Sequence, residues 1–109
     1  LGILSAASTE RVRAFVQRHQ LEAYVQLQMG VDTIISKPNP ALFLQACLSL
    51  GVAPHDTLMV GDSAADIEMA RNAGAAGCIG ICWGRPEAAH LEAADVAISQ
   101  LDEIHVVEV

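Results

Sequence analysis

The stretch that most constrains this 109-residue chain is LMVGDSAADIEMARNAG, residues 58–74. It begins with an apolar run of the kind that fills a buried parallel strand. Gly61 ends that run, and Asp62 follows it directly. Ser63 is a suitable N-cap for a helix that would end at Gly74. The stretch therefore predicts a strand, a tight turn that bears a carboxylate, and a helix.

A second carboxylate, Asp66, follows Asp62 by four residues, within the predicted first turn of the helix. Both side chains can therefore face the same space at the carboxyl end of the strand. Ligands of open α/β sheets bind at such strand ends. Carboxylate oxygens suit a small hard cation such as Mg²⁺, and a helix amino terminus suits a phosphate group.

The rest of the chain alternates predicted strands with predicted helices. Apolar runs predict strands at 1–4, 24–28, 57–60, 75–82 and 95–98, and capped apolar stripes predict helices at 10–19, 40–50, 64–73 and 87–93. Such alternation is typical of parallel βαβ units and of a three-layer, doubly wound α/β sheet. We therefore expect the residues that follow the strands to share one rim of the sheet, namely Ser5, Lys37, Asp62 and Trp83.

Charge and cysteine content exclude several classes of protein. The formal charge is −7, from 13 acidic and 6 basic residues, which argues against a partner such as nucleic acid or an anionic membrane. No apolar run approaches the ~20 residues that a membrane-spanning helix needs. The three cysteines, Cys47, Cys78 and Cys82, form no close-set pairs, so we expect a reducing compartment, the cytoplasm.

Three strings in the sequence resemble motifs of the haloacid dehalogenase superfamily of aspartate-dependent phosphohydrolases. They are ILSAAS with Ser5, SKPNP with Lys37, and VGDSAADIEMARNAGA with Asp62 and Asp66. Their spacing is most similar to the branch that contains phosphoglycolate phosphatase and β-phosphoglucomutase. The resemblance extends over nearly the whole chain.

The family's fourth motif, a DxDGT-like segment that carries the nucleophilic aspartate, has no counterpart in these residues. The resemblance therefore implies that residues 1–109 are the carboxyl-terminal part of one core domain, without its first strand and its cap domain. That strand would lie between those that carry Ser5 and Asp62. Its absence is expected to leave sheet edges unpaired and these residues inactive on their own.

The resemblance also implies a reaction and a role for each residue. The complete protein would be a Mg²⁺-dependent phosphomonoester hydrolase that acts on a small phosphorylated metabolite through an aspartyl-phosphate. Asp62 and Asp66 would hold the metal, Lys37 and Ser5 would bind the phosphate and stabilise its charge, and Ser63 would orient the nucleophile or the substrate. Each residue also has a purely structural alternative. Asp62 and Ser63 could cap a helix, and Asp66 could be an acid favoured in its first turn. Lys37 could lie on the surface, and Ser5 could belong to a turn.

Three other functions were compatible with parts of this pattern. A truncated module without catalysis would retain the motifs but lack the nucleophile. A β-phosphoglucomutase-like phosphomutase would share the same motifs. A phosphoacceptor receiver domain also uses acids, a Ser/Thr and a lysine on such a rim, but its lysine comes after the acids, whereas Lys37 precedes them.

Overall fold

The computed structural model describes residues 1–5, 7–30, 39–84 and 93–107. The strands are β1 (Gly2–Leu4), β2 (Leu27–Met29), β3 (Leu58–Gly61), β4 (Gly77–Ile81) and β5 (Val96–Ile98). The α-helices are α1 (Thr9–Arg18), α2 (Ala41–Leu50) and α3 (Ala64–Ala73), and short 3₁₀ helices lie at η1 (Pro54–Asp56) and η3 (Leu101–Glu103). All three strand pairs are parallel, which confirms the predicted α/β class.

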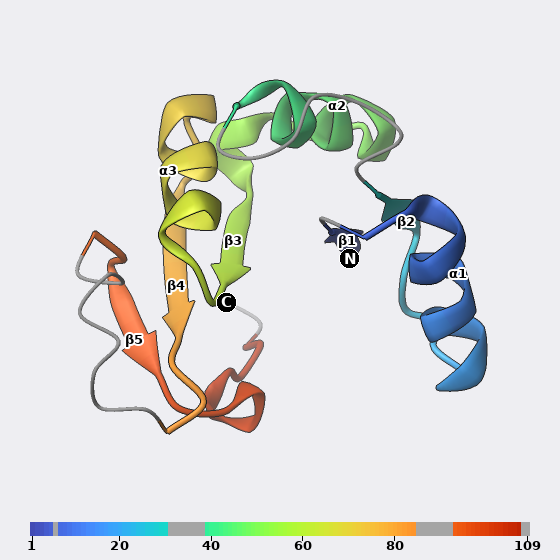
Figure 1. The fold of residues 1–109 in the computed structure, drawn as a ribbon. Helices are drawn as coiled ribbons and strands as arrows, with labels where there is room; N and C mark the ends of the chain where they lie inside the picture. Colours follow the sequence, from blue (N-terminus) through green and yellow to red (C-terminus); the bar gives the residue numbers. More distant parts are fainter. Residues whose placement is uncertain (6, 31–38, 85–92, 108–109) are drawn as a thin grey trace.

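The described strands form two separate parallel sheets. One contains β1 and β2, and the other has the order β3-β4-β5. Figure 1 shows the two sheets on opposite sides of an arch whose top is α2. Helix α2 packs against β1, β2 and α3, so it bridges the two sheets. No ladder among the described residues joins β1 to β3, the place where the sequence predicted that a strand is missing.

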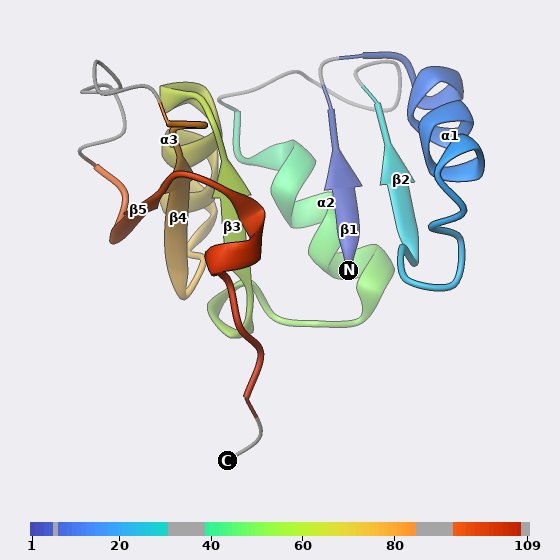
Figure 2. The ribbon, with the colours of Figure 1, turned by 90° about the horizontal axis from the view of Figure 1, so that it is seen from below.

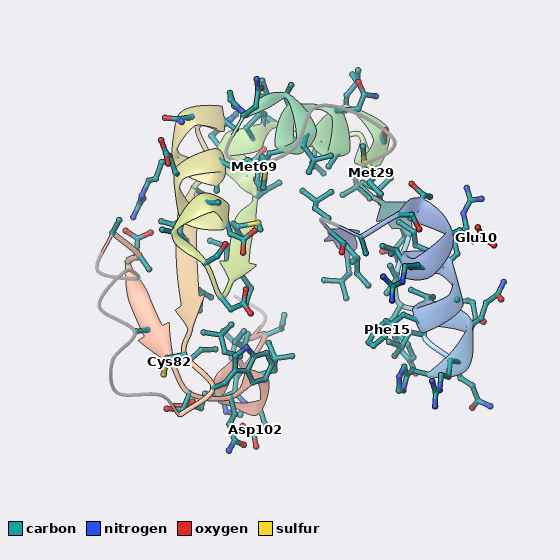
Figure 3. All side chains as sticks on the ribbon, viewed as in Figure 1. Glu10, Phe15, Met29, Met69, Cys82 and Asp102 are labelled. Atoms are coloured by element: carbon teal, nitrogen blue, oxygen red, sulfur yellow. The ribbon has the colours of Figure 1, made fainter. Side chains whose placement is uncertain are left out.

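The core follows this bridging arrangement. Its largest cluster of buried side chains comes from α2, α3 and the strands on either side: Met29, Leu42, Phe43, Ala46, Cys47, Met59, Ile67, Met69, Ala70 and Cys78. Figure 3 labels two members of this cluster, Met29 on β2 and Met69 on α3. The helix therefore holds both sheets in one hydrophobic core, although no backbone ladder connects them.

Local signals in the sequence set most boundaries. Helix α3 has the predicted limits, with Ser63 as N-cap and Gly74 in the left-handed conformation at φ 83°. Helix α2 begins one residue later than predicted, although the Asn39 carboxamide still accepts a hydrogen bond from the Ala41 amide at 2.9 Å. It ends as predicted at Gly51, which has a φ of 70°.

Two predicted strands differ from those observed. The second runs over Leu27–Met29 rather than 24–28, because the Tyr24 amide donates to the Leu21 carbonyl and so belongs to a turn. The fourth is limited to Gly77–Ile81. The predicted helix at 87–93 falls almost wholly outside the described residues. Among the helices that the structure does describe, none has the length and apolar content needed to cross a lipid bilayer.

Candidate active site

The corner between β3 and α3 holds both acidic residues singled out in the sequence. Asp62 follows the last residue of β3 and is exposed, whereas Asp66 lies in the first turn of α3 with only 4% of its surface exposed. The Ser63 hydroxyl donates to Asp66 Oδ2 at 3.0 Å and accepts from the Asp66 amide at 3.3 Å. Ser63 thus caps the helix and fixes the orientation of the buried carboxylate at the same time.

Gly61 makes this corner possible. A Cβ atom at that position would lie 2.4 Å from Asp66 Cβ and 2.7 Å from Asp66 Oδ2. Real Cβ atoms do not approach other atoms so closely, so any larger residue would push the Asp66 carboxylate away from the end of the strand. The glycine that the sequence showed only as the end of an apolar run therefore has a specific packing role.

Ser5 reaches the same region from the other sheet. Its amide donates to the Met29 carbonyl at 3.0 Å, and its Oγ accepts from the Ala7 amide at 3.0 Å. The loop that follows is held against β2, because the Gly30 amide donates to Thr9 Oγ1 at 3.1 Å. These contacts place the Ser5 hydroxyl at the carboxyl end of β1.

A cavity of about 700 Å³ brings the two sheets' polar residues together. Its polar lining comes from Ser5, Asp62, Ser63 and Asp66. Its apolar lining is contributed by both sheets, α2 and the segments after β4 and β5: Leu4, Leu42, Met59, Val60, Ile81, Trp83 and Leu101. Three of the four residues expected on one rim therefore line one space, and the fourth, Lys37, lies outside the described residues.

A second cavity, of about 290 Å³, lies between β1 and β3. We call it the slot; it is lined almost entirely by β1, α2 and β3: Leu1, Gly2, Ile3, Leu4, Phe43, Ala46, Cys47, Leu50, Thr57, Leu58, Met59 and Val60. Leu58 and Val60 are 64% and 37% exposed there. Figure 2, which views the arch from below, shows β1 and β3 on either side of α2. Leu4, Met59 and Val60 line both cavities, so the slot adjoins the cavity that holds the acids.

The residues of the larger cavity suit a hard metal ion. Two carboxylates at the end of one strand are oxygen ligands of the type that Mg²⁺ prefers. Within the described residues, no group of three His, Cys, Asp or Glu side chains could hold a metal together. An ion bound by Asp62 and Asp66 would therefore complete its coordination with water or with groups from elsewhere.

Sequence reasoning missed two features of this region. Leu101 lines the cavity although it follows Asp62 by 39 positions, and no motif marks it. The Arg71 guanidinium, which is exposed, forms an ion pair with Asp95 Oδ1 at 2.9 Å and a hydrogen bond to the Ala93 carbonyl at 2.8 Å. Asp95 Oδ2 also accepts from the Cys78 amide at 2.8 Å, so this network ties α3 and β4 to the start of β5.

Known proteins are similar to this chain in sequence and in fold. The sequence pattern of the haloacid dehalogenase-like hydrolases matches residues 1–79. The chain is 35% identical over 99 residues to a probable phosphatase, IndB, of Dickeya dadantii, in an alignment that covers 86% of this chain and 43% of the relative. It is 37% identical over 86 residues to a phosphoglycolate phosphatase of Chromobacterium violaceum, covering 78% and 38%.

Among solved structures, the fold is similar to that of a haloacid dehalogenase-type hydrolase, family IA, variant 3, from Entamoeba histolytica. The TM-score is 0.82 at 27% identity, over 96% of this chain and 49% of that one. The chain thus spans less than half the length of the curated relatives it matches. Motif, sequence and fold agree, and the chain belongs to the haloacid dehalogenase-like hydrolase family.

Proposed function

We propose that the protein containing this chain is a Mg²⁺-dependent phosphomonoester hydrolase of the phosphoglycolate phosphatase type. It would act through an aspartyl-phosphate whose nucleophile lies outside these residues. One observation carries the proposal: Ser5, Asp62, Ser63 and Asp66 line a single cavity beside the amino terminus of α3. The family and the phosphatases among its relatives support the hydrolase class.

Each residue has a physical role in this proposal. The phosphate group would lie near the first turn of α3, where backbone amides and the helix dipole favour an anion. The Ser5 hydroxyl, which accepts from Ala7 through its oxygen, can donate its proton to a phosphate oxygen. Lys37 would add a positive charge to the same group.

Asp62 and Asp66 would hold Mg²⁺, which when bound supplies charge neutralisation for the phosphate and the nucleophile. Exposed Asp62 is the more direct ligand. Buried Asp66 is held in place by Ser63 and is suited either to bind the ion or to orient water on it. Phosphoryl transfer depends mainly on such positioning and charge neutralisation.

The slot supports the proposal that the nucleophile lies on a strand outside residues 1–109. The strands that line it, β1 and β3, are followed directly by Ser5 and by Asp62. A parallel strand inserted between them would have its carboxyl end between these two residues, at the cavity. Residues 1–109 would then be the carboxyl-terminal part of one core domain and would not turn over substrate alone.

We further propose a small phosphorylated metabolite as the substrate and the cytoplasm as the location. The cavity of about 700 Å³ accommodates a small molecule. Cys47 and Cys78 are both buried thiols rather than half-cystines, as is usual in a reducing compartment.

The test is release of inorganic phosphate from small phosphomonoesters by the protein that contains residues 1–109, with and without Mg²⁺. Asp62→Asn is expected to lower kcat/KM about 100-fold or more, because a charged ligand is lost. Asp56→Asn is the matched control, since Asp56 is an exposed carboxylate in η1 that does not line the cavity. Turnover independent of Mg²⁺, or full activity in Asp62→Asn, would refute the proposal. Transfer of the phosphoryl group to a second sugar hydroxyl instead of water would identify a phosphomutase.

A further inference from the structure

The cavity that holds the acids also has an apolar edge, formed by Trp83 and Leu101. Trp83 follows β4 and Leu101 begins η3. Both line the same cavity as Asp62 and Asp66, and they are 50% and 53% exposed. A phosphate group and a metal ion gain nothing from two large apolar side chains, so this apolar edge needs a different explanation.

The backbone at Trp83 holds an unusual conformation. Its φ is 53° and that of Gly84 is 75°, so two successive residues are left-handed. Residues other than glycine rarely adopt this conformation, and bulky residues adopt it least often. Immediately before the turn, the Cys82 amide donates to the Ile98 carbonyl at 2.8 Å, which fixes the end of the strand. Strained residues of this kind cluster at functional sites.

Leu101 is also fixed by specific contacts. The Glu103 carboxylate accepts hydrogen bonds from the Ser99 amide at 2.6 Å and from the Gln100 amide at 2.8 Å. The Ile104 amide donates to the Leu101 carbonyl at 3.1 Å. Figure 3 labels Cys82 and Asp102, the neighbours of Trp83 and Leu101, in the two segments that meet at this end of the molecule. The apolar edge is therefore held in place by two segments, the turn after β4 and η3.

The size of the cavity indicates what this edge could contact. A phosphate group fills only part of about 700 Å³, which leaves room for the organic part of a monoester. A planar ring on that organic part could stack on the indole and contact the leucine.

We infer that Trp83 and Leu101 select phosphomonoesters whose organic group is a planar apolar ring. The inference rests on the proposed function and deepens it, because it assigns the substrate class of the same site. Trp83 acts as a specificity-determining residue that contacts the leaving group, and Leu101 covers the ring's edge. Phosphoglycolate, which has no ring, would gain nothing from this contact.

The experiment compares kcat/KM for phenyl phosphate and phosphoglycolate with the protein that contains residues 1–109. Trp83→Ala is expected to lower kcat/KM for phenyl phosphate about tenfold and to change that for phosphoglycolate less than about twofold, because only the ring loses its stacking contact. Trp83→Phe should restore most of the loss, and Leu101→Ala should cost about threefold. Tyr24→Ala is the control, since Tyr24 is an exposed aromatic outside the cavity lining.

A second measurement uses fluorescence. Trp83 is the only tryptophan among residues 1–109, so the part of the emission that Trp83→Phe removes reports on this cavity. With MgCl₂ present, phenyl phosphate should change the emission with a tighter Kd than inorganic phosphate does. Equal Kd values, or a Trp83→Ala protein that loses both activities in proportion, would overturn the inference and leave the phosphatase proposal standing. Hydrolysis of neither ester would overturn the proposed function itself, and this inference with it.

Discussion

The corner between β3 and α3 and the slot between β1 and β3 are adjacent, yet they are determined in different ways. The corner is held by residues within a few positions of one another: Gly61 leaves room, Ser63 caps, and Asp66 accepts the serine's hydrogen bond. The slot is formed by strands more than 50 residues apart in the sequence, together with side chains of α2. The corner that would bind the metal in the proposed function is therefore organised by nearby residues, whereas the position of the proposed nucleophile would depend on what enters the slot.

The strongest way to break the corner is Gly61→Ala. The added methyl group would sit 2.4 Å from Asp66 Cβ, so we expect a loss of about 2–3 kcal/mol in the free energy of unfolding, near the upper end for overpacking. Urea denaturation would measure it. Gly2→Ala in β1 is the control, because the nearest atom to its added methyl group would be Leu27 Cβ at 3.3 Å, so it should cost less than about 1 kcal/mol. Equal losses of unfolding free energy at both glycines would show that the corner is no more tightly packed than the surroundings of β1.

A charge in the slot should affect activity more than stability. Leu58→Lys places an ammonium group on a side chain that lines the slot, so we expect kcat/KM for phosphate release to fall about tenfold or more as strand docking is disfavoured. The unfolding free energy of the 109-residue chain should change by about 0.5 kcal/mol or less, since Leu58 is exposed there. Leu48→Lys, on an exposed site of α2 that lines neither cavity, should leave both quantities unchanged. Equal activity losses in the two variants would remove the slot from the proposal.

Two helix caps allow the effect of Ser63 on the proposed metal site to be distinguished from its effect on helix stability. Ser63 caps α3 and Ser8 caps α1, and each side chain accepts from the amide three residues on. Replacing either serine with alanine should cost about 1 kcal/mol. Only Ser63→Ala should also weaken Mg²⁺ binding, because Asp66 loses its hydrogen bond; isothermal titration calorimetry would measure this. Unaltered Mg²⁺ affinity in Ser63→Ala would mean that the serine serves the helix alone.

The smallest effect is expected at the ion pair behind the corner. The hydrogen bond from Arg71, and then that from the Cys78 amide, lowers the pKa of Asp95 below its ordinary value of 3.8. A carboxyl group with a lowered pKa stabilises the fold above pH 3.8, and this contribution disappears as the pH falls through its pKa in the folded protein. Asp95→Asn should therefore lower the urea midpoint slightly at pH 7, because exposed pairs contribute little, and the difference from the natural chain should shrink as the pH falls below 3.8. A difference that does not shrink on acidification would assign the effect to the hydrogen bond to Cys78.

Much of the corner could be predicted because its signals are local. An apolar run, a glycine, a cap residue and a left-handed glycine gave the limits of α3, and the same reasoning placed Ser5, Asp62 and Trp83 at one rim. The roles of these residues stay predictions, as does that of Lys37, which the structure does not describe.

What could not be predicted depends on contacts between distant segments. The pattern of α3 could not show that Asp95 lies within reach of Arg71. No periodicity marks Leu101 as part of the cavity, since η3 is too short to have an apolar stripe. Tyrosine is a residue type that is common in strands, and only the hydrogen bond from the Tyr24 amide to the Leu21 carbonyl shows that Tyr24 belongs to a turn.

The position of α2 has a consequence for how such an enzyme would become active. It keeps the two sheets in one core before any strand joins them, so the halves of the site are already near each other. Completing the backbone ladder and delivering the attacking carboxylate would then be a single event. A protein from which the segment bearing that strand had been cleaved could bind the metal yet leave every phosphate ester intact.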